Sequence, residues 1–240
     1  MKCIILAAGY ATRLYPLTKD KPKALLKVAD KTILEHILAK IKKVDIIDEI
    51  FLVTNDKFYE VFKEWVAGNI NIDVKVINDG TTSNENRLGA IADLQFVIEK
   101  EQINDDIMVL AGDNLFDLEL TDFVEFCKGD CITTHEINDT KRLKNTGVIE
   151  INEDGKVIDF EEKPDTPKSN LAVPPFYIYK QKTLPLIKKY LDDGNNPDAP
   201  GNFIPWLIER KDVYAYKFEG QRYDIGTIES YQEAQELFSG

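Results

Sequence analysis

Four short apolar runs in the first half of the chain alternate with helical patterns, and this alternation constrains the fold more than any other feature. The runs lie at 4–6, 50–54, 74–77 and 107–110. Between them, apolar residues recur at helical spacing over 33–44, 58–66 and 88–98. Strands that are apolar throughout and separated by helices are typical of a parallel sheet covered on both faces. The sequence therefore predicts a doubly wound, Rossmann-like α/β fold with a mostly parallel sheet.

The second half of the chain is β-rich instead. Strand patterns occur at 132–137, 147–151, 157–162 and 176–179, and Asp154-Gly155 predicts a hairpin turn between the second and third of them. Two helical patterns follow, at 183–191 and 203–208. A strand at 213–218 and a closing helix at 228–238 complete the chain's predicted elements. The Pro- and Gly-rich stretch 193–201 is expected to be a surface loop. Because no long linker separates the halves, the sequence predicts a single domain, 1–240. Its first part is 1–130, and its second part, 131–240, contains a β-rich insertion.

Basic charge is concentrated at the start of the chain. Residues 1–31 contain seven Lys or Arg and two Asp, whereas the whole chain has a net charge of −12. Nucleic-acid binding needs an extended basic surface, so this local cluster favours a small anionic ligand, with an ordinary solvated charge cluster as the alternative. No apolar run approaches the roughly 18 residues of a membrane helix. We therefore expect a cytoplasmic protein without a membrane or nucleic-acid partner.

The cysteines and histidines do not suggest a metal site or a hydrolase. Cys3, Cys127 and Cys131 form no C-x-x-C pair, and Gly129 and Asp130 place the last two on different elements, so we expect three free thiols. The two histidines, His36 and His135, have no zinc-type spacing to a cysteine. A Ser-His-Asp or Cys-His site would need one of them as base, and His36 lies within a helical pattern, where a structural role is expected.

The first apolar run ends in a loop suited to phosphate. The segment Ala7-Ala8-Gly9-Tyr10-Ala11-Thr12-Arg13-Leu14 is followed by Pro22-Lys23. Small side chains let a ligand approach backbone N–H groups, while Arg13 and Lys23 supply positive charge. The loop is neither a Walker A motif nor a G-x-G-x-x-G pattern. It predicts a polyphosphate site, although each basic residue alone is more often an ordinary surface residue.

Three more charged residues lie where strands end. Asp113 follows the buried run at 107–110, and Asp224 precedes the closing helix; together they suit Mg²⁺, which favours one or two carboxylates plus substrate phosphates. The alternative for Asp224 is a turn or helix cap, but Thr227 is the better cap. Lys163 precedes Pro164 at a strand end, where a solvated charge is the alternative to a functional role.

These motifs together resemble a known family. The segments are Leu6-Ala7-Ala8-Gly9-Tyr10-Ala11-Thr12-Arg13-Leu14-Tyr15-Pro16-Leu17-Thr18 with Pro22-Lys23, Gly112-Asp113-Asn114-Leu115-Phe116, Glu161-Glu162-Lys163-Pro164 and Tyr223-Asp224-Ile225-Gly226-Thr227. In order and spacing, across nearly the whole chain, they resemble the sugar-1-phosphate nucleotidylyltransferases, especially the glucose-1-phosphate thymidylyl- and uridylyltransferases.

The resemblance implies a GT-A-like nucleotidyltransferase fold and transfer of a nucleotidyl group from UTP or dTTP to glucose 1-phosphate, which gives a nucleotide sugar and pyrophosphate. The first part, 1–130, would bind the nucleotide, and 131–240 would bind the sugar phosphate. The implied catalytic residues are Arg13, Lys23 and Asp113; the nucleotide-binding residues are Leu6, Ala8, Gly9, Ala11, Thr12, Asn84 and Gly89; the sugar-phosphate-binding residues are Gly147, Glu162, Lys163 and Tyr177; and the Mg²⁺ ligands are Asp113 and Asp224. Relatives commonly form dimers or tetramers, so the resemblance also suggests a homo-oligomer.

The chain departs from the family pattern at three places. Ala11 replaces the usual second glycine of the first loop, the base loop at 82–89 lacks the common proline, and Pro174-Pro175 stands where relatives have a small residue and glycine. These departures leave the base and the acceptor open.

Three alternatives to this function follow. The first is a CTP-dependent cytidylyltransferase that acts on phosphocholine or another non-sugar phosphate. A glycosyltransferase of similar architecture would need an Asp-x-Asp motif, which Asp113-Asn114-Leu115 does not supply. A regulatory subunit that had lost catalysis would lack the charged site residues, which are all present here.

Overall fold

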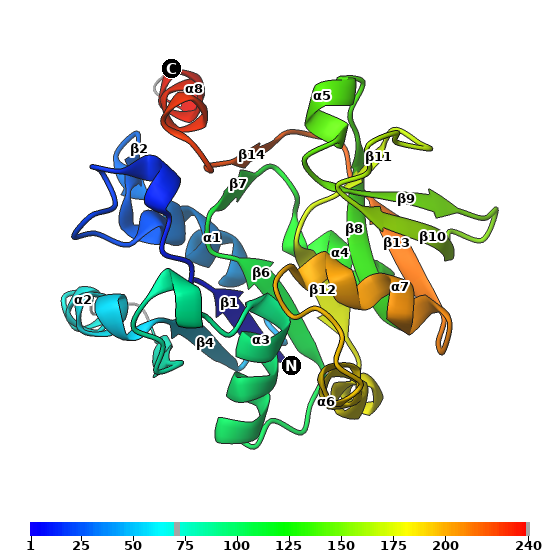
Figure 1. Ribbon diagram of the computed structural model, residues 1–240, viewed down its shortest axis with the longest axis horizontal. Coiled ribbons are helices and arrows are strands. Elements are labelled where there is room, and N and C mark those ends of the chain that lie inside the picture. The colour runs from blue at the N-terminus through cyan, green and yellow to red at the C-terminus, as the bar shows by residue number, and fades with distance from the viewer. Residues whose placement is uncertain (70–72, 239–240) are drawn as a thin grey trace.

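The computed structural model describes residues 1–69 and 73–238, and ten of the strands in these ranges form one mixed sheet (Figure 1). These strands are β1 (Lys2–Leu6), β4 (Glu49–Thr54), β5 (Lys75–Asn78), β6 (Ile107–Ala111), β8 (Asp130–Glu136), β9 (Gly147–Ile151), β10 (Val157–Glu162), β11 (Leu171–Val173), β12 (Phe176–Tyr179) and β13 (Val213–Lys217). Their order is β10-β9-β11-β8-β12-β6-β1-β4-β5, and β13 pairs with β8. Two short pairs lie outside this sheet, β2 (Lys27–Val28) with β3 (Lys31–Thr32) and β7 (Asn114–Phe116) with β14 (Arg222–Asp224).

The helices cover both faces of the sheet (Figure 1). They are α1 (Ile33–Ile41), α2 (Asp56–Ala67), α3 (Ala90–Lys100), α4 (Leu120–Phe126), α5 (Thr140–Leu143), α6 (Leu184–Asp192), α7 (Phe203–Ile208) and α8 (Ile228–Phe238). Side chains of α1, α2, α4 and α8 belong to one hydrophobic cluster, and those of α3, α6 and α7 belong to a second cluster. The doubly wound arrangement predicted from the sequence is confirmed.

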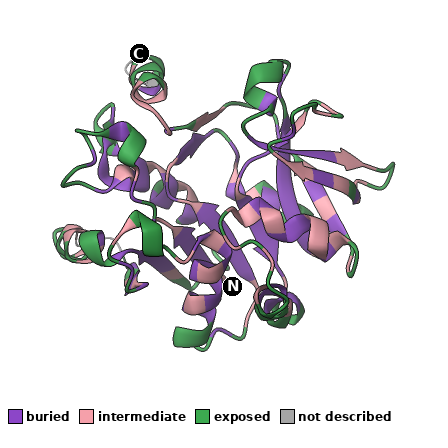
Figure 2. Cartoon of the chain, viewed as in Figure 1, coloured by how far each residue is buried: buried purple, intermediate pink, exposed green. Residues whose placement is uncertain are grey.

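The four predicted apolar runs form the parallel half of the sheet. In this half β1 lies between β4 and β6, with Lys2 opposite both Glu49 and Ile107, and β5 adds to the far side of β4. Alternation along β1 divides the core, because Cys3 and Ile5 belong to the first cluster whereas Ile4 belongs to the second. Figure 2 shows these central strands buried and the outer surfaces of the helices exposed.

The β-rich second half continues the same sheet with antiparallel pairs. β12 pairs with β6 and with β8, and β11 joins β8 to β9. β13 returns parallel to β8. The predicted hairpin between β9 and β10 is present, with Gly155 at φ +77° in its turn. The β6–β12 pair therefore joins the two halves of the chain into one sheet. As a result, loops from both halves can meet where the central strands end.

Local sequence signals explain the helix ends. In α1 the Thr32 hydroxyl accepts from the Glu35 N–H at 3.1 Å while the Glu35 carboxylate accepts from the Thr32 N–H at 2.6 Å, which is the predicted capping box. Before α8, the Thr227 hydroxyl accepts from the Ser230 N–H at 3.2 Å, so Thr227 is the cap and Asp224 is not. The helix predicted from residue 88 begins at Ala90, because Gly89 has φ +93° and ψ +154°.

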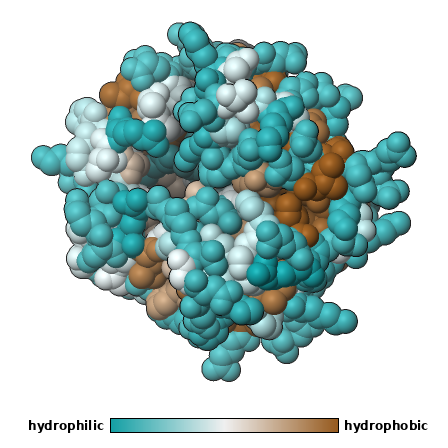
Figure 3. Space-filling view, turned by 45° about the vertical axis from the view of Figure 1, so that its right-hand side comes forward, coloured by the Kyte–Doolittle hydropathy of each residue, from teal (hydrophilic) through white to brown (hydrophobic). Residues whose placement is uncertain are grey.

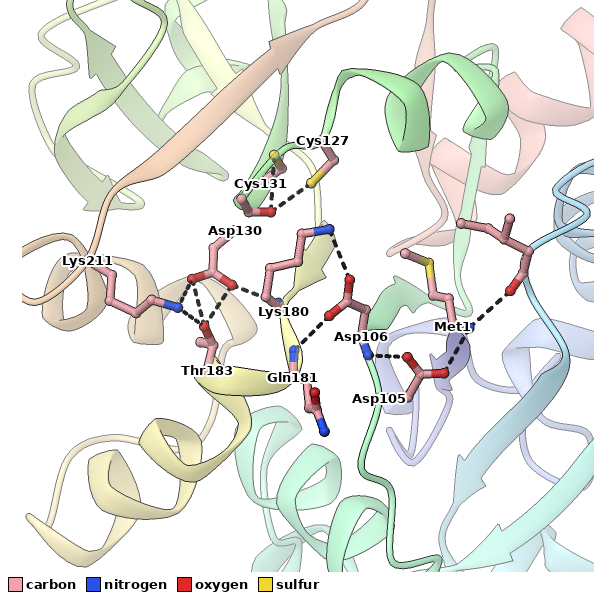
Figure 4. A network of polar contacts seen from close by, with 12 residues as sticks. Met1, Asp105, Asp106, Cys127, Asp130, Cys131, Lys180, Gln181, Thr183 and Lys211 are labelled. Atoms are coloured by element: carbon pink, nitrogen blue, oxygen red, sulfur yellow. Dashed lines mark hydrogen bonds and ion pairs between the residues drawn. The ribbon is translucent and has the colours of Figure 1, made fainter.

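Two aspartates fix the connection between β12 and α6 (Figure 4). Asp130, which is 1% exposed, accepts from the Lys180 N–H and the Thr183 hydroxyl, and its Oδ2 lies 2.7 Å from Lys211 Nζ. Asp106 pairs with Lys180 Nζ at 3.0 Å and accepts from the Gln181 N–H at 2.8 Å. The buried Asp130 charge is therefore both paired and hydrogen-bonded.

The cysteines lie on different elements, as predicted. Cys3 is in β1, Cys127 ends α4 and Cys131 is in β8, and all three are free and buried. Figure 3 shows a largely hydrophilic surface whose most extensive apolar area lies on the right-hand side, with smaller apolar areas elsewhere. Among the helices of residues 1–69 and 73–238, none is long and apolar enough to cross a membrane.

Candidate active site

A cavity of about 470 Å³ opens where β1 and β6 end, and it receives residues from both halves of the chain. This is the edge of a parallel sheet at which ligands of open α/β folds bind. Every site residue predicted from the sequence lines the cavity: Leu6, Ala8, Gly9, Ala11, Thr12, Arg13, Lys23, Asn84, Gly89, Asp113, Gly147, Glu162, Lys163, Tyr177 and Asp224. The structure thus brings the predicted residues together, while their individual roles stay predictions.

The loop after β1 is held by backbone contacts. The Ala7 N–H donates to the Val53 carbonyl at 2.9 Å, and the buried Asn55 side chain donates to the Ala8 carbonyl at 2.8 Å. Ala11 has φ +47° and ψ +39°, and its carbonyl accepts from the Thr18 hydroxyl at 2.8 Å. This left-handed conformation explains why glycine suits the position, since alanine adopts it at a cost of about 1–2 kcal/mol.

Two carboxylates and a lysine come together in the lining of the cavity. Lys23 Nζ lies 2.5 Å from Asp113 Oδ2, and the Asn114 amide donates to Asp113 Oδ1 at 2.5 Å. Asp224 lies opposite Asn114 in the β7–β14 pair, and the Ile225 N–H donates to the Asp113 carbonyl at 3.2 Å. The ribbon β7–β14 therefore places Asp224 beside Asp113, although the two are far apart in sequence.

The two carboxylates have opposite pKa shifts. Burial acts to raise the pKa of Asp113, but the positive charge and hydrogen bond of Lys23 outweigh it, so the pKa falls below its ordinary value. For Asp224, burial and the negative charge of Asp113 raise the pKa, and Arg222, Lys23 and Arg13 oppose this only in part. A second negative charge at this position is therefore unfavourable unless further positive charge is present.

The donor set at this point fits Mg²⁺. Two neighbouring carboxylates line the cavity, and the negative charge of Asp113 adds to burial in raising the pKa of Asp224. Mg²⁺ is commonly bound by one or two carboxylates together with substrate phosphates and water. Within the described part of the chain no group of three or more His, Cys, Asp or Glu side chains could hold a metal ion, so substrate oxygens would have to complete the coordination.

The opposite side of the cavity comes from the second half of the chain. Glu162 ends β10, and Lys163 follows it with φ +51° and its N–H bonded to the Thr146 carbonyl at 3.1 Å. Lys163 Nζ lies 3.6 Å from Glu162 Oε1, and burial raises the pKa of Glu162. Gly147 packs against the same strand, because a Cβ there would lie 2.6 Å from the Phe160 ring. Only a glycine leaves this wall open beside Glu162.

Tyr177 lies at the base of this side. It is 2% exposed and stacks on Tyr179 with ring centroids 5.8 Å apart. Burial raises its pKa. Pro175, one of the two prolines that depart from the family pattern, also lines the cavity, and its carbonyl accepts from the Ala111 N–H at 3.2 Å.

The segment 197–201 connects the two sides of the cavity. The Ala90 and Ile91 N–H groups, at the start of α3, donate to the Asp198 and Pro197 carbonyls at 3.2 and 2.9 Å. Arg87 Nε lies 2.9 Å from Asp198 Oδ1. Gly201, at the end of the segment, lies against Phe160 and the Glu162 carboxylate. The stretch 193–201, expected to be a surface loop, thus contributes Asp198, Ala199, Pro200 and Gly201 to the cavity lining.

Sequence reasoning missed several charged lining residues. Arg222 donates a hydrogen bond to the Asn114 side chain and lies 3.6 Å from Asp224. Both residues lie on β14, two positions apart, and side chains two positions apart on a strand point to the same face. Recognition of this strand in the sequence would therefore have placed Arg222 beside Asp224. Arg87, Asp198 and Asp93 also line the cavity. The sequence carries no local signal for the Arg87–Asp198 pair, because these residues meet only through tertiary folding.

Comparisons with known proteins place the chain in one family. A model of the nucleotidyl transferase family matches residues 2–239, so the chain belongs to that family. It is 28% identical over 229 residues to the bifunctional protein GlmU of Methanocaldococcus jannaschii, covering 94% of this chain and 51% of that protein. It is 29% identical over 248 residues to a glucose-1-phosphate adenylyltransferase of Fervidobacterium nodosum, covering 96% and 59%. The chain thus spans about half to three fifths of the length of these two curated relatives.

Solved structures agree with this placement. A Bacillus anthracis protein crystallised with sucrose matches with a TM-score of 0.81 and 28% identity, over 100% of this chain and 95% of the other. A UDP-glucose pyrophosphorylase crystallised with UDP-glucose matches with a TM-score of 0.79 over 99% of this chain and 97% of the other, and at 23% identity it supports the fold alone. The family resemblance and the fold class predicted from the sequence are confirmed.

Proposed function

We propose that the chain transfers a nucleotidyl group from a nucleoside triphosphate to a sugar 1-phosphate, with release of pyrophosphate. The observation that carries the proposal is the position of the Lys23–Asp113–Asp224 cluster between two sides of one cavity. One side is the loop after β1 with Arg13, and the other holds Glu162 and Lys163. A cavity with a cationic loop on one side and a lysine on the other suits two phosphate-bearing substrates.

The reaction needs no nucleophile from the protein. An oxygen of the sugar phosphate forms a bond to the α-phosphorus, the bond from that phosphorus to the bridging oxygen breaks, and pyrophosphate leaves with the electron pair. Because the attacking phosphate is already ionised, the chain's own residues need only position the substrates and stabilise charge. When bound by Asp113 and Asp224, Mg²⁺ would supply further neutralisation of the triphosphate.

Each basic residue has a place in this scheme. Arg13 and Lys23 are assigned to the triphosphate, because both lie beside the loop after β1. Lys163 is assigned to the phosphate of the acceptor, since its Nζ adjoins Glu162 on the opposite side. Glu162 then accepts hydrogen bonds from sugar hydroxyls, and the glycine at 147 leaves room for the ring.

The finer substrate assignment is UTP or dTTP with glucose 1-phosphate, as the motifs suggest. It is supported on the base side by Asn84, an amide that lines the cavity and can both donate and accept. A second candidate is CTP with phosphocholine or another non-sugar phosphate. The observation in its favour is Pro175, which lines the acceptor side where a small residue or glycine is usual and so changes the shape of that wall.

The test is a pyrophosphate-release assay that combines five nucleoside triphosphates with glucose 1-phosphate, other sugar 1-phosphates and phosphocholine. Lys23→Ala is expected to lower turnover by about 10²–10³. The exposed Lys19, which is outside the cavity lining, provides the matched control Lys19→Ala. Unchanged turnover in Lys23→Ala, or no pyrophosphate release with any pair, would contradict the proposal.

A further inference from the structure

Two acidic side chains that the proposed reaction does not use are neighbours near the start of α3, and one of them lines the cavity. Asp79 follows β5 and is 8% exposed, and Asp93 lies in the first turn of α3 and is 6% exposed. The negative charge of Asp79 raises the pKa of Asp93, so the two carboxyl groups are neighbours. Asp93 lines the cavity together with Gly89 and Ala90.

A hydrogen bond between the two carboxyl groups would satisfy their buried oxygens, and it requires a proton. Asp79 Oδ1 accepts from the Thr81 N–H at 2.6 Å and from the Thr81 hydroxyl at 2.8 Å. Asp79 Oδ2 and Asp93 Oδ1 are buried, and neither has a hydrogen-bond partner among the described residues. Since a carboxylate can only accept, a bond between these two oxygens must use a proton that one of them carries.

The electrostatic surroundings keep that proton on the pair at neutral pH. Burial, reinforced by the negative charge of Asp79, raises the pKa of Asp93 to about 8. Burial also raises the pKa of Asp79, and the charge of Asp56 at the start of α2 adds to this. Tyr10, from the loop after β1, is a further titratable group nearby, and its hydroxyl lies 3.4 Å from the Thr81 hydroxyl. Within the described part of the chain, the main influences on these two pKa values are burial, Thr81, Asp56 and the two carboxyls themselves, none of which is a cation.

The second oxygen of Asp93 is left for a ligand. Among the described residues, Asp93 Oδ1 is fully buried without a hydrogen-bond partner, whereas Oδ2 is not one of these enclosed oxygens. With the proton held between the two carboxyls, Oδ2 can only accept. Leaving a nearly buried acceptor without a donor costs about 1–3 kcal/mol, so a ligand N–H at this position gains a strong contact.

We propose that Asp93, backed by Asp79, accepts a hydrogen bond from an N–H group of the nucleobase and so determines which nucleotide is bound. This rests on the proposed function, because it takes a nucleoside triphosphate as one substrate. Among the pyrimidine bases of the proposed substrates, the N–H donor is the ring N3–H of uracil or thymine or the exocyclic amino group of cytosine. Asn84 adds a second polar contact on the same side of the cavity.

The variants separate base recognition from the fold. In Asp93→Asn the amide can donate to Asp79 Oδ2 in place of the shared proton, and the amide oxygen remains for the cavity. Asp93→Ala removes both interactions. Asp122, an exposed aspartate in the first turn of α4, provides the matched control Asp122→Ala.

Calorimetric titration of the full chain with UTP, dTTP, CTP and inorganic triphosphate provides the test, between about pH 6.5 and about pH 8.5 to bracket the pKa of Asp93. For the preferred nucleotide we expect Asp93→Ala to weaken binding roughly ten-fold and Asp93→Asn to retain it. Inorganic triphosphate should bind equally to all variants. Wild-type affinity for the nucleotide should fall as the pH rises through about 8, and this dependence should vanish in Asp93→Asn.

The outcomes are distinguishable. Preference for UTP or dTTP identifies the ring N–H as the group bound, and preference for CTP identifies the amino group. If Asp93→Ala binds every nucleotide as the wild type does, or loses nucleotide and inorganic triphosphate equally, Asp93 does not read the base. If the wild type binds none of the nucleotides, the proposed function itself is wrong.

Discussion

Replacement of Gly89 by alanine should be one of the most damaging small substitutions in the chain. Gly89 has φ +93° and ψ +154°, a region that essentially only glycine occupies. A Cβ at this position would lie 2.7 Å from the Pro197 carbonyl oxygen and 3.0 Å from the Asp198 Cα. The substitution therefore strains the backbone and also forces two segments apart.

The magnitude follows from these two costs. An unfavourable backbone conformation costs of order 1–3 kcal/mol, and forced overpacking typically costs another 1–3 kcal/mol. The reduced entropy of the unfolded chain returns about 0.4–1 kcal/mol. A net loss of about 3 kcal/mol is expected, which lowers the melting temperature of a chain of this size by roughly 10 °C.

Gly194→Ala is the matched control. Gly194 also has positive φ, +78°, but nothing lies within 4 Å of a Cβ there, so its cost is the backbone term alone, about 1 kcal/mol. Thermal unfolding followed by circular dichroism, with urea titration at 25 °C, measures both variants. Equal losses in Gly89→Ala and Gly194→Ala would refute the argument that the contact with 197–198 makes the larger contribution.

Two further predictions concern buried polar groups. Asp130→Ala should lower the free energy of unfolding, measured by urea titration, by about 3 kcal/mol. The substitution leaves the Lys180 N–H and the Thr183 hydroxyl without their acceptor and Lys211 without its ion pair. A loss below about 1 kcal/mol would contradict this prediction. Burial, with smaller contributions from nearby arginines, lowers the pKa of His135 from 6.5 to about 4. Because the unfolded chain then binds a proton more readily than the folded chain, the free energy of unfolding should decrease as the pH falls from about 6.5 to about 4. The total decrease should be up to roughly 3 kcal/mol. His135→Leu should flatten this pH dependence of unfolding, and an unchanged slope would show that other groups control it.

The parallel half of the fold could be predicted from sequence because its strands are buried on both faces. Residues 107–110 are apolar at every position, so no alternation is needed to recognise the strand. The three-residue strands β7 and β14 are too short to show a period, and they were missed. Their pairing nevertheless brings Asp224 to Asp113. The motifs predicted that these two carboxylates act together, but no local pattern indicated the strand pair that joins them.

The candidate site divides in the same way. Residues such as Arg13 and Lys23 belong to local motifs, and the structure brings them to one cavity as expected. Asp198 lies in a stretch whose Pro and Gly content indicates a surface loop, and composition alone does not show that such a loop folds back over α3. Asp93 was not singled out, because an aspartate in the first turn of a helix is usually explained by the helix dipole.

The segment 197–201 has a thermodynamic consequence for any pair of ligands in the cavity. Its first residues cap α3 on one side, and Gly201 rests on the Glu162 carboxylate on the other. A ligand that restrains one end of this shared wall lowers the entropy that the second ligand must lose on binding. The linkage is reciprocal, so each ligand increases the affinity of the other by the same factor. An inhibitor that occupies only one end should therefore bind more tightly to the half-filled enzyme than to the empty one.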